Sequence, residues 1–124
     1  MIERRFDADS GIIHVVGTGI WKRADVDTHY GAIRGIAAGL REAGRPIRLL
    51  SDVTGAERQA PDIEAYIKLQ MERTFAPGDR MALLVPDIHA QRHIRTLLGN
   101  AEVATFCSRD AAEAWLRNDM RETA

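Results

Sequence analysis

The stretch AGRPIRLLSDVTGAERQAPDIEAY, residues 43–66, contains a helix end, a strand and a helix start in one continuous run. Gly44 can take the left-handed conformation that ends many helices, and Pro46 cannot continue a helix. Residues 46–53 form an apolar run of strand length, and after a short loop Pro61 suits the first position of a helix. A strand between two helices predicts an α/β fold with parallel strands.

The same alternation continues on both sides of this stretch, which gives the order ββαβαβαβα. The connector DADSG ends in Gly11 and suits a hairpin, so the first two strands should be antiparallel, with right-handed crossovers between the later ones. We therefore predict a single α/β domain over residues 1–124, with 118–124 as a flexible tail. The predicted strands are residues 3–6, 12–19, 46–53, 80–85 and 101–106. The predicted helices start near Asp25, at Pro61, at Asp87 and at Ser108.

Composition narrows the class of protein. The chain has 124 residues, 45% of them hydrophobic, enough for one compact core. Seventeen Lys and Arg against eighteen Asp and Glu give a net charge of −1, which disfavours nucleic acid as a partner. No apolar run reaches the eighteen or so residues that cross a membrane, so membrane insertion is not expected. A single cysteine, Cys107, fits a reducing cytoplasm.

Several strings in this order resemble the SpoIIAA-like (STAS) fold family, in particular its small stand-alone STAS/SEC14-like branch. They are FDADSGIIHVVGTGIW, AGRPIRLLSDV, FAPGDRMALLV and AEVATFCSRDAAEAWL, and together they cover nearly the whole chain. The resemblance implies a SpoIIAA-like fold and a non-enzymatic regulatory or protein-interaction module. The SEC14-like label implies an alternative, a carrier or sensor for a small apolar or lipid-like ligand.

Classical STAS regulators carry a phosphorylatable serine just after the third strand. Here Asp52-Val53-Thr54-Gly55 resembles the end of that strand, but QAPDIE stands where the acceptor serine would be. Ser51 and Thr54 are nearby hydroxyls at other positions. We therefore expect a module without the usual phosphoserine switch.

Polar side chains follow three of the predicted parallel strands, where ligands of open α/β sheets tend to bind. They are Asp52 with Thr54, then Asp87, then Cys107 with Ser108. Two converging carboxylates could hold a hard cation or act as an acid–base pair. The alternative is structural: Asp52 closes a turn, and Asp87 and Ser108 are helix caps.

Histidine and cysteine spacing gives no metal or catalytic set, and we expect neither a cofactor nor a catalytic site. His89 and His93 lie four residues apart on one helix, a spacing that can place two imidazoles on one metal. Further ligands are missing from any recognisable motif, so we interpret both as solvated residues on the polar face. Cys107 is either a reactive thiol near a helix start or a small packing residue.

The segment Gly17-Thr18-Gly19 lacks the length and the lysine of a phosphate-binding loop. We predict instead the end of a strand that a neighbouring backbone or an aromatic ring approaches closely, with Trp21 just beyond it. If the carrier hypothesis holds, Trp21 should line the mouth of an apolar cavity. The residues we assign to ligand binding are Trp21, Asp52, Thr54, Tyr66, Met71 and Phe75.

The long helix before Gly44 presents two different faces. Val26, Tyr30, Ile33, Ala37 and Leu40 form a stripe that can pack on the sheet. Gly31, Gly35 and Gly39 lie on nearly the opposite side, although each interior glycine costs roughly 0.5–1 kcal/mol relative to alanine. This glycine face is either tolerated and exposed, one wall of a groove, or an interface with a second copy or another protein.

Overall fold

The computed structural model describes residues 1–99 and 102–122, the side chains only as far as residue 117. Its element order is ββαβαβαβα, as predicted. The strands are β1 (Ile2–Asp7), β2 (Ile12–Gly19), β3 (Arg48–Ala56), β4 (Arg80–Leu84) and β5 (Val103–Phe106). The helices are α1 (Arg23–Glu42), α2 (Pro61–Thr74), α3 (Ile88–Leu98) and α4 (Arg109–Glu122).

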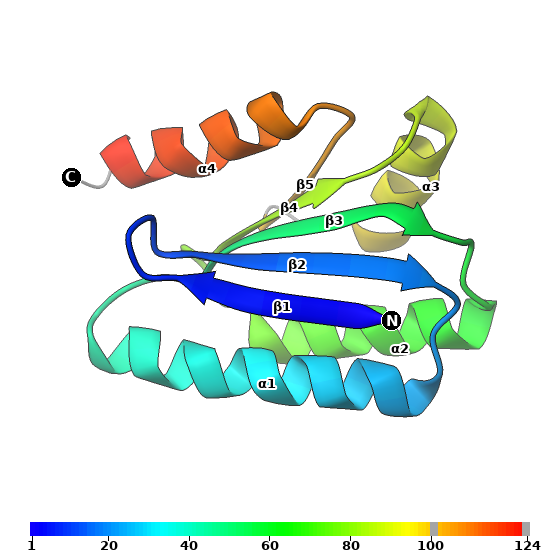
Figure 1. Ribbon diagram of the computed structural model, residues 1–124, viewed down its shortest axis with the longest axis horizontal. Helices are drawn as coiled ribbons and strands as arrows, with labels where there is room; N and C mark the ends of the chain where they lie inside the picture. Colours follow the sequence, from blue (N-terminus) through cyan, green and yellow to red (C-terminus); the bar gives the residue numbers. More distant parts are fainter. Residues whose placement is uncertain (100–101, 123–124) are drawn as a thin grey trace.

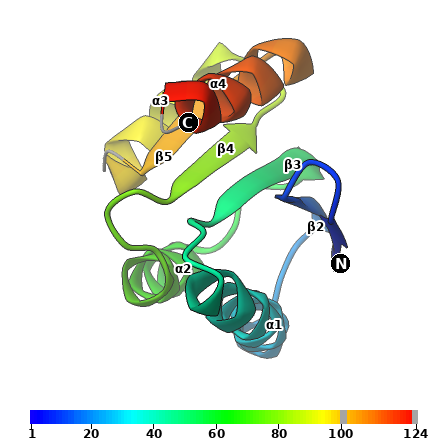
Figure 2. The same cartoon turned by 90° about the vertical axis from the view of Figure 1, so that its left-hand side faces the viewer.

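The five strands form one sheet in the order β1-β2-β3-β4-β5. The hairpin pairs β1 with β2 in antiparallel fashion, and each later pair is parallel. Helices α1 and α2 cover one face of the sheet and α4 covers the other (Figures 1 and 2). The sheet is therefore the middle layer of three, and the parallel strands β2 to β5 end at one common edge.

Two apolar cores lie on the two faces of the sheet. The larger core joins the predicted stripe of α1 to inward side chains of β2, β3 and β4, and α2 and α3 pack against it. The smaller core lies under α4 and contains Ile12, Leu50, Ala82, Ala112 and Leu116. Neighbouring residues of one strand enter opposite cores because strand side chains alternate between the two faces.

Several boundaries differ from the sequence prediction. β3 continues through Thr54, Gly55 and Ala56, which we predicted as loop, because this segment pairs with the end of β2 after an irregularity in the register. The strand predicted from residue 101 begins at Val103, and residue 101 itself lies outside the described part. α4 continues to Glu122, so most of the predicted tail 118–124 is helical and its last two residues lie outside the described part.

The ends of the helices follow ordinary capping chemistry. α1 begins at Arg23, six residues before His29, and the amide of Lys22 donates to Asp25 Oδ2 at 2.8 Å. Gly44 adopts a positive φ of 69° after α1. Asp87 caps α3 by accepting from the amide of Ala90 at 2.9 Å, as the capping interpretation requires. Among the described residues, no helix is long and apolar enough to cross a membrane.

Candidate functional site

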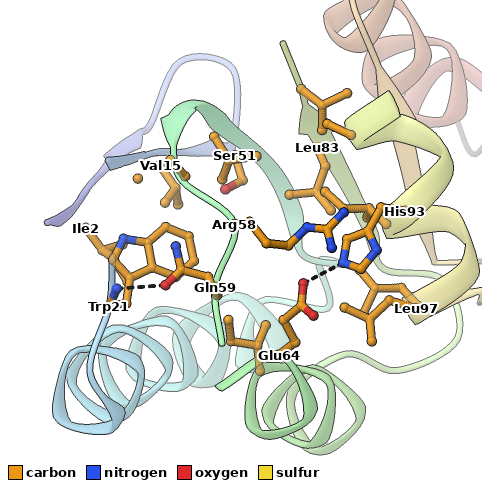
Figure 3. A pocket seen from close by; sticks show the side chains of 18 of the residues that line it. Ile2, Val15, Trp21, Ser51, Arg58, Gln59, Glu64, Leu83, His93 and Leu97 are labelled. Carbon is orange, nitrogen blue, oxygen red and sulfur yellow. Dashed lines mark hydrogen bonds and ion pairs between the residues drawn. The ribbon is translucent and has the colours of Figure 1, made fainter. Parts of the chain in front are cut away.

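A pocket of about 300 Å³ lies between the sheet and the helices α1, α2 and α3 (Figure 3). It sits at the carboxyl-terminal half of β2, β3 and β4, where open α/β sheets tend to bind ligands. The loop between β3 and α2, residues 57–60, forms a further wall. Most of the wall is apolar, and its apolar residues include Ile2, Val15, Val26, Val53, Ile67, Met71, Leu83, Val85, Ile94 and Leu97.

The sheet contributes the floor of the pocket through every second residue of each strand. On β3 these residues are Ser51 and Val53, whereas Asp52 and Thr54 point to the α4 side. Ser51 is buried, with 5% of its surface exposed, and its hydroxyl has no hydrogen-bond partner among the described residues. A ligand could therefore find one polar group on an otherwise apolar floor.

The end of the pocket nearest β1 is closed by Trp21. A Cβ added to Gly17 would lie only 2.6 Å from Cζ2 of the indole, so this ring needs a glycine beneath it. The indole Nε1 also donates to the carbonyl of Thr18 at 2.9 Å. The predicted close approach to this glycine segment is confirmed, and of the two alternatives it is the aromatic ring that lies there.

The side chain of Gln59 holds the 57–60 loop against the turn between β2 and α1. Its Oε1 accepts from the amide of Trp21 at 2.7 Å, and its Nε2 donates to the carbonyls of Gly19 and Glu57 at 2.9 and 2.8 Å. Gln59 is itself buried. The hydrogen bonds to Trp21 and Gly19 couple this wall of the pocket to the turn between β2 and α1, and the bond to Glu57 lies within the loop.

One buried histidine also lines the pocket. His29 of α1 is 7% exposed, and its Nδ1 has no hydrogen-bond partner among the described residues. Burial lowers the pKa of His29 to about 4, with a smaller contribution from the positive charge of Arg4. The imidazole is therefore neutral at pH 7, and the Trp21 end of the pocket carries no charge from it.

The opposite end of the pocket, toward α3, is charged. His93 Nε2 of α3 lies 2.6 Å from Glu64 Oε2 of α2, and this contact joins the two helices across the pocket (Figure 3). His89 and Arg58 also line this region. We interpreted His89 and His93 as solvated residues, but His93 is half-buried and paired because α3 turns this side toward α2.

The residues assigned to ligand binding from the sequence fall into two groups. Trp21 and Met71 line the pocket. Tyr66 and Phe75 do not, because both pack on the outer side of the main core. The hydroxyl of Tyr66 donates to Asp27, and Arg23 stacks over its ring with 4.0 Å between the guanidinium carbon and the centroid.

Asp52 and Thr54 lie on the α4 side of the sheet, away from the pocket. Asp52 pairs with Arg109 at 2.8 Å and accepts from the Thr54 hydroxyl at 2.6 Å. Burial opposes ionisation of Asp52, but the hydrogen bonds from Thr54 and the charge of Arg109 outweigh it and lower the pKa of this carboxyl. Since Asp87 caps α3, these two carboxylates have separate structural roles.

The remaining predicted features have ordinary surroundings. Ser108 Oγ accepts from the amide of Ala111 at 3.3 Å and caps α4, whereas Cys107 is exposed. Among the described residues, no three His, Cys, Asp or Glu side chains could together hold a metal ion. A Cβ added at any position of the glycine face of α1 (Gly31, Gly35 and Gly39) would meet no atom within 4 Å.

Sequence reasoning missed Ser51 as a pocket residue, as well as His29, Arg58, Gln59 and Glu64. Two signals were present in the sequence. Ser51 has the same strand parity as Leu49 and Val53, and His29 is next to the apolar stripe of α1. Nothing local marks Arg58, Gln59 or Glu64, because their positions depend on how the 57–60 loop and α2 meet α3.

Comparisons with known proteins bear on the fold. No protein-family model matches the chain, and no curated protein sequence matches it either. The structure is similar to the crystal structure of an uncharacterized protein of the DUF3478 family from Shewanella loihica, with a TM-score of 0.62 and 18% sequence identity. The match covers 94% of this chain and 92% of that chain. That protein is described as having a SpoIIAA-like fold, and this chain has the SpoIIAA-like fold too.

Proposed function

We propose that this protein binds a small, mainly apolar ligand in the pocket beneath the sheet and acts as a non-enzymatic carrier or sensor. The observation that carries the proposal is the pocket itself, about 300 Å³ in volume and largely apolar in its lining. Small-molecule sites are typically clefts of roughly 300–1,000 Å³ with apolar walls and a few polar groups. The pocket falls at the lower end of this range, which favours a single-chain or single-ring ligand.

The pocket would take a ligand with little rearrangement on the sheet side. Its floor consists of strand residues held by the parallel ladder, and Gln59 fixes the loop beside Trp21. A preformed apolar site does not have to order its own walls when the ligand enters, so less binding free energy is lost.

Two measurements test the proposal. Native mass spectrometry of the purified protein should show a co-purifying small molecule, and the neutral fluorophore N-phenylnaphthylamine should bind and brighten. In Ala90→Phe a ring enters the pocket from α3, and we expect the affinity for the fluorophore to fall about tenfold or more, ~1.4 kcal/mol. Ala114→Phe, on the exposed side of α4, is the matched control and should bind as the wild type does.

Equal fluorophore affinity in Ala90→Phe and the wild type would contradict the proposal, provided that both variants give the same far-ultraviolet circular dichroism. Failure of the wild-type protein to bind the fluorophore, together with only the bare chain mass in native spectra, would also contradict it.

A second candidate function is a STAS-like protein-interaction module without the usual phosphoserine switch. The SpoIIAA-like fold supports it, and so does the open glycine face of α1, onto which a second copy or another protein could pack closely. Its test is the mass of the wild-type protein and of Gly35→Leu by light scattering. A strictly monomeric mass in both would remove self-association.

A further inference from the structure

Charge is distributed unevenly around the pocket. No Asp, Glu, Lys or Arg lines the end formed by β1, β2 and the start of α1. The one titratable group there, His29, is neutral at pH 7. The charged lining residues are Glu57 and Arg58 of the 57–60 loop and Glu64 in the first turn of α2, and α3 adds the imidazoles of His89 and His93. A ligand that is apolar along its whole length would therefore place apolar groups against the charged end of the pocket and form no polar contact there.

Arg58 is the cation at this charged end. Its side chain extends from the loop toward His93 (Figure 3). Among the described residues its guanidinium makes no hydrogen bond or ion pair, and the carboxylate of Glu64, at the same end, is held by His93 at 2.6 Å. Arg58 therefore adds to the pocket a positive charge that is held in no ion pair of the described chain, although the carboxylate of Glu57 also lines the pocket.

The helix that follows the loop contributes only Glu64 of its first turn to the pocket lining. α2 starts at Pro61, and its N-cap residue, Ala60, provides no side-chain oxygen to accept from the first amides. The helix N-terminus carries a partial positive charge, although Asp62 and Glu64 in its first turn reduce the effect. Because residues 60–63 do not line the pocket, Arg58 is the group at this end that favours a negative head.

We propose that the pocket takes a single-chain acidic amphiphile, whose carboxylate or phosphate head contacts Arg58 and whose apolar chain extends toward Trp21. The assignment rests on the proposed ligand-binding function and adds the chemical class and the orientation of the ligand. Arginine is suited to such a head because its guanidinium donates two parallel hydrogen bonds to the oxygens of a carboxylate or phosphate.

Competition against the neutral fluorophore tests the assignment. Decanoate, decyl phosphate, decanol and decyltrimethylammonium have the same apolar chain and differ only in the head. We expect at least one of the two acids to bind the wild-type protein with about tenfold higher affinity than decanol, as measured by displacement of the fluorophore. The reason is that a charge-assisted hydrogen bond adds affinity. The better of the two acids identifies the head group.

The variants locate the effect. In Arg58→Gln the preference for the acid over decanol should fall to about twofold or less, with the affinity for decanol unchanged, and in Arg58→Lys part of the preference should remain. Arg45→Gln removes one charge from an exposed loop residue outside the pocket, and it should behave as the wild type does.

The outcomes separate this proposal from the one on which it rests. If the fluorophore binds but decanol or decyltrimethylammonium competes as well as the acids, the head-group assignment is wrong and the ligand pocket stands. The same conclusion follows if Arg58→Gln keeps the full preference for the acid. If the wild-type protein does not bind the fluorophore at all, both proposals fail.

Discussion

His29 is a titratable side chain in an apolar setting, and its burial links protonation to stability. An imidazole nitrogen that is removed from water and left without a partner has a free-energy cost, roughly 1–3 kcal/mol for a typical polar group. The surrounding main core offsets this cost.

Stability should fall as the pH is lowered from about 7 toward 4. The pKa of His29 is about 4 in the folded protein and near 6.5 in the unfolded chain, so in this window only the unfolded chain takes up the proton. The loss approaches ~3 kcal/mol, at 1.36 kcal/mol per pKa unit. Denaturant melts of the wild type and His29→Phe at several pH values measure it.

His29→Phe should flatten this part of the pH profile, whereas His89→Gln, on the exposed side of α3, should leave it unchanged. Burial also lowers the pKa of His14, which adds a smaller loss of the same sign in both variants. A His29→Phe profile as steep as the wild-type profile would show that His29 is not the group responsible.

Among the helices, α1 combines a well-packed face with a face that has open space. Its stripe residues Val26, Tyr30 and Ile33 are all nearly inaccessible to solvent. On the opposite side the glycine face has room for side chains at all three positions. The three glycines therefore weaken the helix without being required by the packing of this chain.

Gly35→Ala should raise the free energy of unfolding by about 0.5–1 kcal/mol. Alanine fits here because the φ of Gly35 is not positive and an added Cβ meets no atom within 4 Å. Thermal melts at two protein concentrations check the result. Gly44→Ala is the contrasting variant, since its φ of 69° should make the same substitution destabilising.

Destabilisation by Gly35→Ala together with a decrease in molecular mass would mean that the glycine face is covered in solution. That outcome would support the interaction-module hypothesis. An increase in stability at constant mass would instead show that the face is free.

Across the molecule as a whole, Asp79 connects three segments that are distant in the sequence. Its carboxylate accepts from the amides of Ile47 and Ala76 at 2.8 Å each, and it pairs with Arg41 at 2.9 Å. The end of α1, the start of β3 and the turn before β4 therefore meet at one buried side chain. This junction lies at the amino-terminal ends of the strands, on the other side of the molecule from the ligand pocket.

Asp79→Ala should destabilise the protein by about 2–4 kcal/mol, because buried backbone donors lose their acceptor. Burial opposes ionisation of Asp79, but the hydrogen bonds from Arg41, Ala76 and Ile47 outweigh it and hold the pKa below 3.8. This stabilisation is thus fully present above pH 4 and is lost as the pH falls through the folded-state pKa.

Urea melts at neutral pH measure the effect of Asp79→Ala, with Asp9→Ala in the exposed hairpin loop as the control. The control should stay within about 0.5 kcal/mol of the wild type. Equal midpoints for Asp79→Ala and the control would show that this junction does not stabilise the fold.

Local signals in the sequence were enough to predict the order of the elements, the buried stripe of α1 and a close approach to the glycine segment 17–19. These features depend on hydrophobic period, on helix-ending residues such as Gly44 and Pro46, and on contacts over a few positions. Signals of this kind are present in the chain before it folds. The SpoIIAA-like fold itself was implied by the resemblance of several strings to that family, and the structural comparison supports it.

Which residues form the candidate site, in contrast, became clear only from the packing of the folded chain. Asp52 and Ser51 are neighbours in the sequence, yet the alternation of β3 directs one to Arg109 and the other into the pocket. Glu64 meets His93 across 29 positions. Such pairs follow from the packing of whole helices against a sheet, and because their energy comes from groups that meet only after folding, no local pattern records them.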